Sequence, residues 1–166
     1  MGIVLKGDAM KKVAAYTRKC LEITEHELQR TLQRLGEEAI IIARDRPMEE
    51  SWIDHTGNLR SSIGYAIYKN GNKATESGFL PTSAPKGNGN EGQKQGRAFL
   101  ESVAKGVIDT NSQSLVVVAG MNYAASVEAI DGKDVLATAE LKTRAKLPEY
   151  MLKTKQRINT LIAQVR

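Results

Sequence analysis

Apolar residues recur at helical spacing near the start of the chain. Steps of three, four and seven residues place them on one side, while the other side carries the charged stretches TEHELQR and GEEA. The pattern predicts one long helix over 8–44, which begins at Asp8 as a possible N-cap and ends before Pro47. A glycine at position 36 lowers helix propensity, so a bend is expected there. The predicted buried face consists of Leu21, Leu28, Leu32, Leu35, Ala39 and Ile42.

A pattern with a period of two follows the polar stretch DHTGN, and this alternation predicts a β-strand. The small residues Gly64 and Ala66 leave one face of this strand nearly flat, so that another element can pack closely against it. The pair Asn70-Gly71 is a strong hairpin signal, which predicts a sheet and hairpin over about 59–79. The alternating residues are Ile63, Tyr65 and Ile67 on one face, and Ser62, Gly64, Ala66 and Tyr68 on the other.

The segment 80–97 is rich in Gly, Pro, Asn and Ser and has no apolar period, which predicts a long loop. Its composition favours a loop that is mobile in the isolated subunit and becomes ordered against a partner. Three of its glycines match the spacing G-x-G-x-x-G, but no buried strand precedes them, so a dinucleotide site is not expected. A short helix is predicted over 97–107, ended by Gly106. The glycines of the match are Gly87, Gly89 and Gly92.

The stretch SLVVVAG at 114–120 is continuous in β-branched residues and predicts a central strand. Helical patterns follow at about 132–146 and from Pro148 onward, a residue that suits a first helical position. The sequence therefore predicts a single α+β domain over 1–166: a small antiparallel or mixed sheet with a long N-terminal helix, a middle helix and C-terminal helices. The last helix is expected to bury Met151, Ile158, Ile162 and Val165.

Composition narrows the class of protein. The chain has 166 residues, of which 41% are hydrophobic and 26% charged, as in ordinary globular domains. Cys20 is the only cysteine in the sequence, so no intrachain disulfide can form, and a reducing compartment is expected. The apolar runs AIIIA and LVVVA are far too short to span a membrane, and the first ten residues do not read as a signal peptide.

The charge of the chain is concentrated at its end. The net charge is +5, and residues 141–166 hold seven Lys and Arg against the single acid Glu149, which gives +6 for this segment. A basic end is typical of proteins that bind nucleic acid or an acidic partner. A solvated helix face gives the same composition, so both interpretations stay open.

The candidate chemistry is sparse. The histidines of the sequence are His26 and His55, and no orienting group is evident for either. Asp54 and His55 are neighbours in sequence, so in a strand they would point to opposite faces. One cysteine and two histidines make a poor zinc site. These observations predict no catalytic residues, no cofactor and no metal site. The carboxylates of Glu128, Asp131 and Asp134 could hold a divalent ion, although acids at a helix start more often complement its dipole.

Two motifs about sixty residues apart carry a family resemblance. The first is Thr56-Gly57-Asn58-Leu59-Arg60 with Ser62-Ile63, followed by the Asn-Gly hairpin. The second is Tyr123-Ala124 with Val127-Glu128, directly after the valine-rich strand. Over roughly 10–145 the chain resembles the head–tail joining or tail-completion (neck) proteins of tailed double-stranded DNA phages.

This resemblance implies a non-enzymatic virion component, made in the bacterial host cytoplasm and located in the neck of the particle. Such a subunit forms a homo-oligomeric ring between the portal or connector and the tail proteins. DNA passes the ring without sequence-specific binding, and no membrane is involved. A basic DNA-binding accessory module remains the alternative function, and a small hydrolase built on His55 is a weaker one.

The resemblance and the charge pattern indicate contact residues. Arg60 is either a surface cation or one half of an intersubunit pair with an acid such as Glu128. For Tyr123 a half-buried position in the core is favoured over a contact role. The flat strand face and the loop 80–97 are expected to meet neighbouring subunits. The candidate interface residues are Gly57, Asn58, Leu59, Arg60, Tyr123, Glu128, Lys153 and Arg157.

Overall fold

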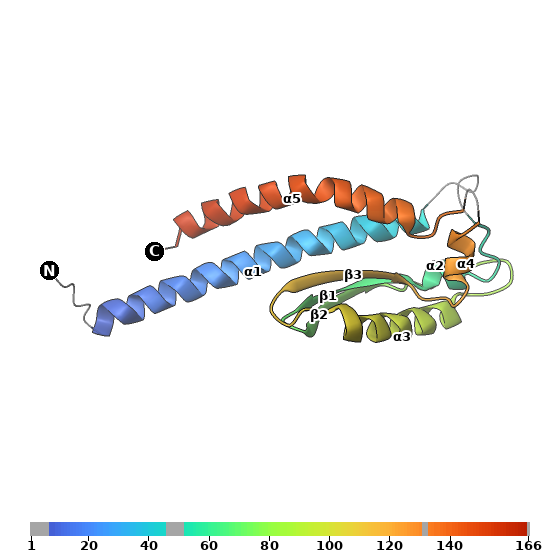
Figure 1. Cartoon of the computed structure of the whole chain (residues 1–166), viewed down its shortest axis with the longest axis horizontal. Coiled ribbons are helices and arrows are strands. Elements are labelled where there is room, and N and C mark those ends of the chain that lie inside the picture. The colour runs from blue at the N-terminus through green and yellow to red at the C-terminus, as the bar shows by residue number, and fades with distance from the viewer. Residues whose placement is uncertain (1–6, 46–51, 131–132, 166) are drawn as a thin grey trace. The chain divides into compact units, whose positions relative to one another are not determined.

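The computed structural model describes residues 7–45, 52–130 and 133–165 (Figure 1). It confirms the predicted α+β class, with a long N-terminal helix, a three-stranded antiparallel sheet and helices after it. Contacts gather into two compact units, one formed by residues 7–31 with 148–165 and the other by 32–147. The elements are α1 (Gly7–Arg44), α2 (Asn58–Ser61), β1 (Ile63–Lys69), β2 (Asn72–Gly78), α3 (Asn90–Val107), β3 (Gln113–Ala119), α4 (Ala124–Glu128) and α5 (Ala137–Ala163).

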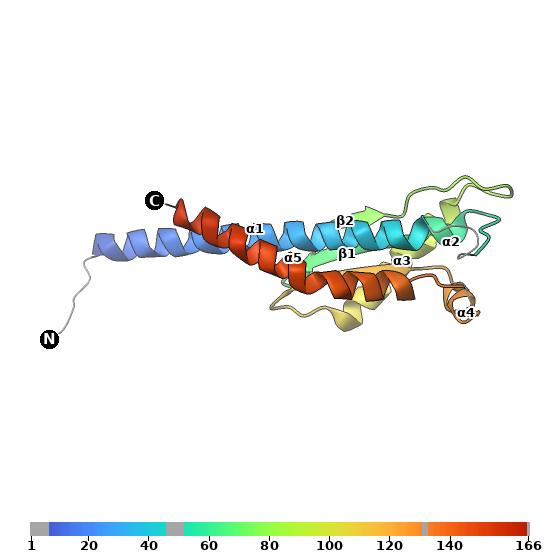
Figure 2. The same cartoon turned by 90° about the horizontal axis from the view of Figure 1, so that it is seen from above.

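The helix α1 runs close to its predicted bounds, and the predicted end at Pro47 lies outside the described residues. Its buried face differs from the expected stripe at one end, because Leu21 is largely exposed. The burial increases toward the C-terminal part of α1, where the helix packs on the sheet within the unit 32–147 (Figures 1 and 2). The buried residues of that part include Leu35, Ala39, Ile40 and Ala43.

The strand order is β2-β1-β3, so β1 and not β3 is the central strand. This corrects the prediction for 114–120, which rested on a continuous run of valines. All residues of β1 from Ile63 to Tyr68 are buried, whereas Leu115 and Val117 of β3 are only partly covered. The predicted hairpin is confirmed, since Asn70 and Gly71 both have positive φ, at 50° and 82°.

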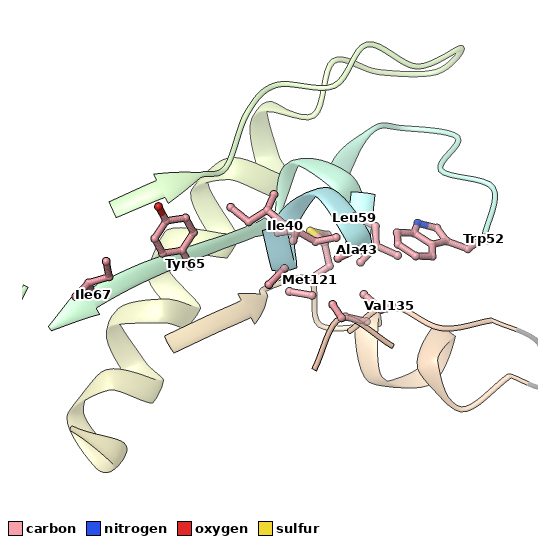
Figure 3. Close-up of a cluster of buried hydrophobic side chains, with 13 residues drawn as sticks. Ile40, Ala43, Trp52, Leu59, Tyr65, Ile67, Met121 and Val135 are labelled. Atoms are coloured by element: carbon pink, nitrogen blue, oxygen red, sulfur yellow. The ribbon is translucent and has the colours of Figure 1, made fainter. Parts of the chain in front are cut away.

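The nearly flat face of β1 is covered by the chain itself, which corrects its assignment to a neighbouring subunit. A Cβ on Gly64 would lie 2.5 Å from the ring of Phe79. Ala66 is fully buried in a cluster with Leu100 and Val116, so α3 occupies this face. The opposite face packs in a second cluster that includes Tyr65, Ile67, Ile40 and Ala43 of α1, and Leu59 and Met121 (Figure 3).

The helix α3 begins at Asn90, so the predicted loop 80–97 is too long, and residues 90–97 are helical. Sequence reasoning missed the helical residues 90–97 because the glycines there allow close packing, whereas it interpreted them as a sign of flexibility. A Cβ on Gly92 would lie 2.0 Å from the carbonyl oxygen of Asn58, and one on Gly96 would lie 2.6 Å from the ring of Phe79. The helix ends at Val107, the predicted bound, with Gly106 as its last residue but one.

The two predicted C-terminal helices form one helix, α5, with Pro148 inside it. Proline lacks the amide hydrogen and interrupts one backbone hydrogen bond, but it does not end the helix here. In the unit formed by 7–31 and 148–165, the hydroxyls of Thr31 and Thr154 lie 2.5 Å apart. Ile158, Ile162 and Val165 of the predicted face are partly buried, as expected, but Met151 is exposed and the buried residue one turn before Ile158 is Thr154.

Candidate functional site

The first motif forms a tight turn that leads into β1. Gly57 has φ 74°, and a Cβ there would lie 2.0 Å from the carbonyl oxygen of Thr82, so only glycine fits. Asp54 accepts a hydrogen bond from the Arg60 backbone amide at 2.8 Å. Asp54 therefore secures the short helix α2, and it points to the chain's own backbone rather than to His55. The carbonyl of His55 accepts a bond from Lys86 at 2.9 Å.

Asn58 and Leu59 anchor this turn to two other parts of the unit. The side-chain oxygen of Asn58 accepts a hydrogen bond from the Gly92 amide at 3.2 Å, which connects the turn to the start of α3. Leu59 is fully buried beside Trp52 and Ala43 in the core (Figure 3). Both residues thus hold the fold of a single chain together.

Two buried serines connect the first motif with neighbouring segments, a role that sequence reasoning assigned neither to Ser62 nor to Ser61. The Ser62 hydroxyl donates to the Leu59 carbonyl at 2.8 Å and accepts from the Met121 amide at 3.3 Å. The Ser62 carbonyl also accepts from the Gly120 amide at 3.1 Å. Ser61 accepts from the Thr82 amide at 2.9 Å. Both serines are fully buried, and the only hint in the sequence is a Ser-Ser pair directly before an apolar strand.

Arg60 interacts with α1 and with an aromatic ring. Its guanidinium donates to the carbonyl of Arg44 in the last turn of α1, where a cation complements the helix dipole. It also lies over the Trp52 ring, 5.4 Å from the centroid. The neighbouring Arg44 donates to the Thr82 hydroxyl at 3.0 Å, and burial lowers the pKa of Arg44. These contacts hold Arg60 within its own chain, and its pairing with an acid of a neighbouring subunit stays a prediction.

Tyr123 brings the second motif next to the first. Burial and the charge of Asp54 raise the pKa of Tyr123, and a hydrogen bond with Thr56 opposes this shift. The side chain is 38% exposed, which is more open than the half-buried core position favoured from the sequence. Tyr123 therefore lies at the surface where the two motifs meet.

Glu128 caps the N-terminal end of α5. Its carboxylate accepts three backbone amides, those of residues 135, 136 and 137, at 3.0, 2.9 and 3.0 Å. Asp134 accepts from the Thr138 amide at 2.9 Å in the same turn. Both acids thus complement a helix N-terminus. This is the role that the sequence offered for them as the alternative to a divalent ion site. Asp131 lies outside the described residues. Among those that the structure does describe, no three His, Cys, Asp or Glu side chains gather as metal ligands would.

The predicted contact cations of α5 form ion pairs inside the unit made of 7–31 and 148–165. Arg157 lies 2.8 Å from the carboxylate of Glu27, whose side chain is only 7% exposed. Lys153 lies 2.5 Å from Glu149, one helical turn before it. Arg157 therefore neutralises a nearly buried acid of its own chain rather than standing clear of its neighbours on a helix flank.

Other cations of the basic end are also paired. Arg144 lies 2.9 Å from Glu140, and Lys146 lies 2.7 Å from Glu38 of α1, both within the unit 32–147. The net charge of residues 141–166 therefore overstates how much positive charge is available to an external anion.

Three aliphatic side chains next to the two motifs are more than half exposed. Ile53 precedes Asp54, Leu80 follows the buried Phe79, and Ile130 follows α4. Large aliphatic side chains exposed at the surface of a small domain are candidates for a contact surface. Sequence reasoning missed all three, because single apolar residues in turns give no periodic signal. We name this group, together with Tyr123, the junction surface.

Comparison with known proteins gives no match to this chain, whether with family models, curated proteins or solved structures. The structure therefore assigns the chain to an architectural class only. It is an α+β chain whose two sequence motifs meet at one end of a three-stranded sheet. In the described parts of the chain, no helix combines the length and apolar character that crossing a bilayer requires.

Proposed function

We propose that this chain is a structural subunit of the neck of a tailed phage, which assembles head to tail into a ring between the portal or connector and the tail. The subunit carries out no chemistry, and duplex DNA passes through the ring without being read. Its place of action is the virion, and its partners are copies of itself and the adjoining neck and tail proteins.

The observation that supports this proposal is the direct connection of the two motifs. The resemblance to neck proteins rests on the pair of motifs. In the structure Tyr123 of the second motif hydrogen-bonds with Thr56 of the first, and Ser62 bonds to Gly120 and Met121, shortly before the second motif. Residues of both motifs also have specific roles, as Gly57 and Glu128 illustrate. Two motifs that contact each other in the fold make the resemblance to neck proteins more specific than two short sequence matches would be by themselves.

The junction surface offers a contact for assembly. Its aliphatic members lie in segments that interact with the motifs. Asp54, next to Ile53, interacts with Tyr123, the Thr82 amide two residues after Leu80 donates to Ser61, and the Ile130 amide donates to Val127. Contact between this surface and a different face of the next subunit is heterologous, and such contacts close into a ring when the rotation allows.

The DNA-binding alternative receives less support than the composition suggested. Four cations of residues 141–166 are paired with carboxylates of the same chain. Each phosphate contact requires a cation that is free to neutralise it, so pairing reduces the affinity expected for duplex DNA. A conduit for DNA benefits from weak contacts, which agrees with the neck assignment.

The proposal can be tested by native mass spectrometry over a range of protein concentrations. We expect a single closed oligomer to dominate at high concentration in the wild type. Changing Ile53 and Leu80 together to Ser should weaken assembly without altering the unfolding temperature of the monomer. The matched control is Leu141→Ser, which removes an equally exposed aliphatic side chain from α5, outside the junction surface.

A monomer at every concentration, combined with tight and salt-sensitive binding to duplex DNA, would favour the DNA-binding module instead. Equal effects of the junction variant and the Leu141→Ser control would show that the junction surface has no special part in assembly.

A further inference from the structure

The strand β3 presents an open backbone edge. Gly120 donates to Ser62, and Asn70 donates to Ser112, so the even-numbered residues of β3 are the ones that bond to β1. In an antiparallel pair the alternate residues turn their N–H and C=O groups away from the partner strand. The backbone groups of Leu115 and Val117 therefore face outward. Within the described ranges no further strand pairs with this side of β3.

This edge lacks the features that usually protect edge strands. The other edge strand, β2, contains a bulge opposite Ile67 and Tyr68 and carries Lys73 and Glu76, which form ion pairs with α3. Bulges and charges of this kind prevent unwanted strand pairing. The sequence of β3, QSLVVVA, has no charge and no proline. An exposed apolar edge without protection is a natural place for strand addition.

An apolar groove of about 280 Å³ lies along the same edge, within the unit 32–147. Its wall is formed by β3, by the first turns of α5 and by one residue of α1. The ion pair of Glu140 and Arg144 lines its polar side. The apolar lining consists of Ala39, Leu115, Val117, Leu136 and Ala139.

Thr143 adds an independent sign that the groove is incomplete. Its hydroxyl is buried, lines the groove and finds no hydrogen-bond partner among the residues that the structure describes. Leaving a buried hydroxyl without a partner destabilises the protein, so such groups are usually satisfied by a ligand or water. Open backbone groups, apolar side chains and an unsatisfied hydroxyl thus occur together at one place.

One strand of a second copy, β2, is poorly suited to this place. The strand β2 of a second copy would direct Thr75 and Ser77 toward the apolar lining, because these residues lie opposite Ile67 and Tyr65 on that face. Polar side chains without partners are costly there.

We propose that the β3 edge and its groove bind an extended segment of a partner protein, which adds to the sheet as a fourth strand. The segment carries aliphatic side chains at alternate positions that fill the groove, and its backbone bonds to Leu115 and Val117. This site lies apart from the junction surface, and the inference holds whether or not the chain belongs to a phage neck.

The proposal can be tested with a synthetic peptide that copies β1, the strand that β3 already accepts. The probe is a fluorescent, end-capped IGYAIYK peptide, and its binding to the full chain is measured by fluorescence anisotropy. Wild-type protein should bind it. A peptide N-methylated on the amides of its residues 1, 3 and 5 keeps its side chains but loses the hydrogen bonds of one edge, so it should bind about tenfold more weakly or not at all.

Two protein variants address the edge directly. Val117→Pro removes an amide that faces outward, so it breaks no bond to β1, and Val117→Lys places a charge against the apolar lining. Both should weaken peptide binding about tenfold or more, as loss of strand addition requires. The matched control is Ala74→Lys, which adds the same charge to the exposed part of β2. Circular dichroism of each variant reports whether the fold is retained.

Peptide binding that is insensitive to N-methylation, or unchanged in a folded Val117→Lys protein, would overturn the proposal. Absence of binding to the wild type would do the same. Self-association of the wild type that Val117→Lys abolishes would identify a second copy as the occupant and would also contradict the partner segment. A failure of ring assembly in the mass measurement, with peptide binding intact, would affect only the neck assignment.

Discussion

The replacement of Gly36 by Ala tests how the sheet packs against α1. In an exposed helix this change stabilises by about 1 kcal/mol, because alanine has a higher helix propensity than glycine. In this chain a Cβ at position 36 would lie 2.7 Å from two ring carbons of Tyr65. Ordinary contacts between carbon atoms are about 3.5–4.0 Å, so the ring or the helix must move by about 1 Å.

Tyr65 has little freedom to make that movement. Its ring is fully buried on the central strand, and its hydroxyl donates to Glu37 at 2.8 Å. Overpacking of a well-packed core costs about 1–3 kcal/mol, which exceeds the gain in helix propensity. We expect Gly36→Ala to lower the free energy of unfolding by about 1 kcal/mol and the melting temperature by about 2–4 °C.

The assay is urea unfolding followed by far-UV circular dichroism, with Gly106→Ala as the control. Gly106 is also helical, but a Cβ there meets nothing within 4 Å, so that change should stabilise slightly. Tyr65→Leu should relieve the overlap, and a double-mutant cycle with Gly36→Ala should give a coupling of about 0.5–3 kcal/mol. Equal stabilisation by both alanine variants, without coupling, would refute the packing argument.

Three further outcomes follow from specific contacts. Glu128→Ala should cost about 1–3 kcal/mol in thermal unfolding, because three backbone amides at the start of α5 lose their acceptor. Arg157→Gln should lower the unfolding temperature more than Lys155→Gln, since it leaves the nearly buried Glu27 without its closest cation, and equal effects would contradict this. Burial, and after it the hydrogen bond to Glu37, raises the pKa of Tyr65 above that of a tyrosine in the unfolded chain. The free energy of unfolding should therefore fall as pH rises above about 10, where the unfolded tyrosine loses its proton, and it should fall less in Tyr65→Phe.

The elements that sequence reasoning identified correctly have local causes. The long apolar stripe was sufficient for α1, and the Asn70-Gly71 pair was sufficient for the hairpin, because both signals lie within a few residues of the structure they specify. The α+β class followed from the order of these elements. The role of Glu128 at the start of a helix was also among the predictions, as the alternative to a divalent ion site.

The errors concern contacts between distant segments. The run of valines in β3 predicted a central strand, but β3 is an edge strand. Valines occur both in a strand with neighbours on both sides and in an edge strand whose face borders a groove, so the sequence alone does not separate the two cases. The glycines in the first turns of α3 resembled a flexible loop, although Gly92 and Gly96 allow close approach to Asn58 and Phe79. Buried serines such as Ser62 are invisible to hydrophobic patterns, so the connection between the motifs emerged only from the structure.

The ring itself is the central claim, and electron microscopy of the concentrated protein tests it most directly. We expect class averages that show a closed ring of identical subunits around a channel wide enough to admit duplex DNA. The Ile53 and Leu80 double variant should give far fewer rings under the same conditions. Images of dispersed monomers, closed dimers or open filaments from the wild-type protein would contradict the account.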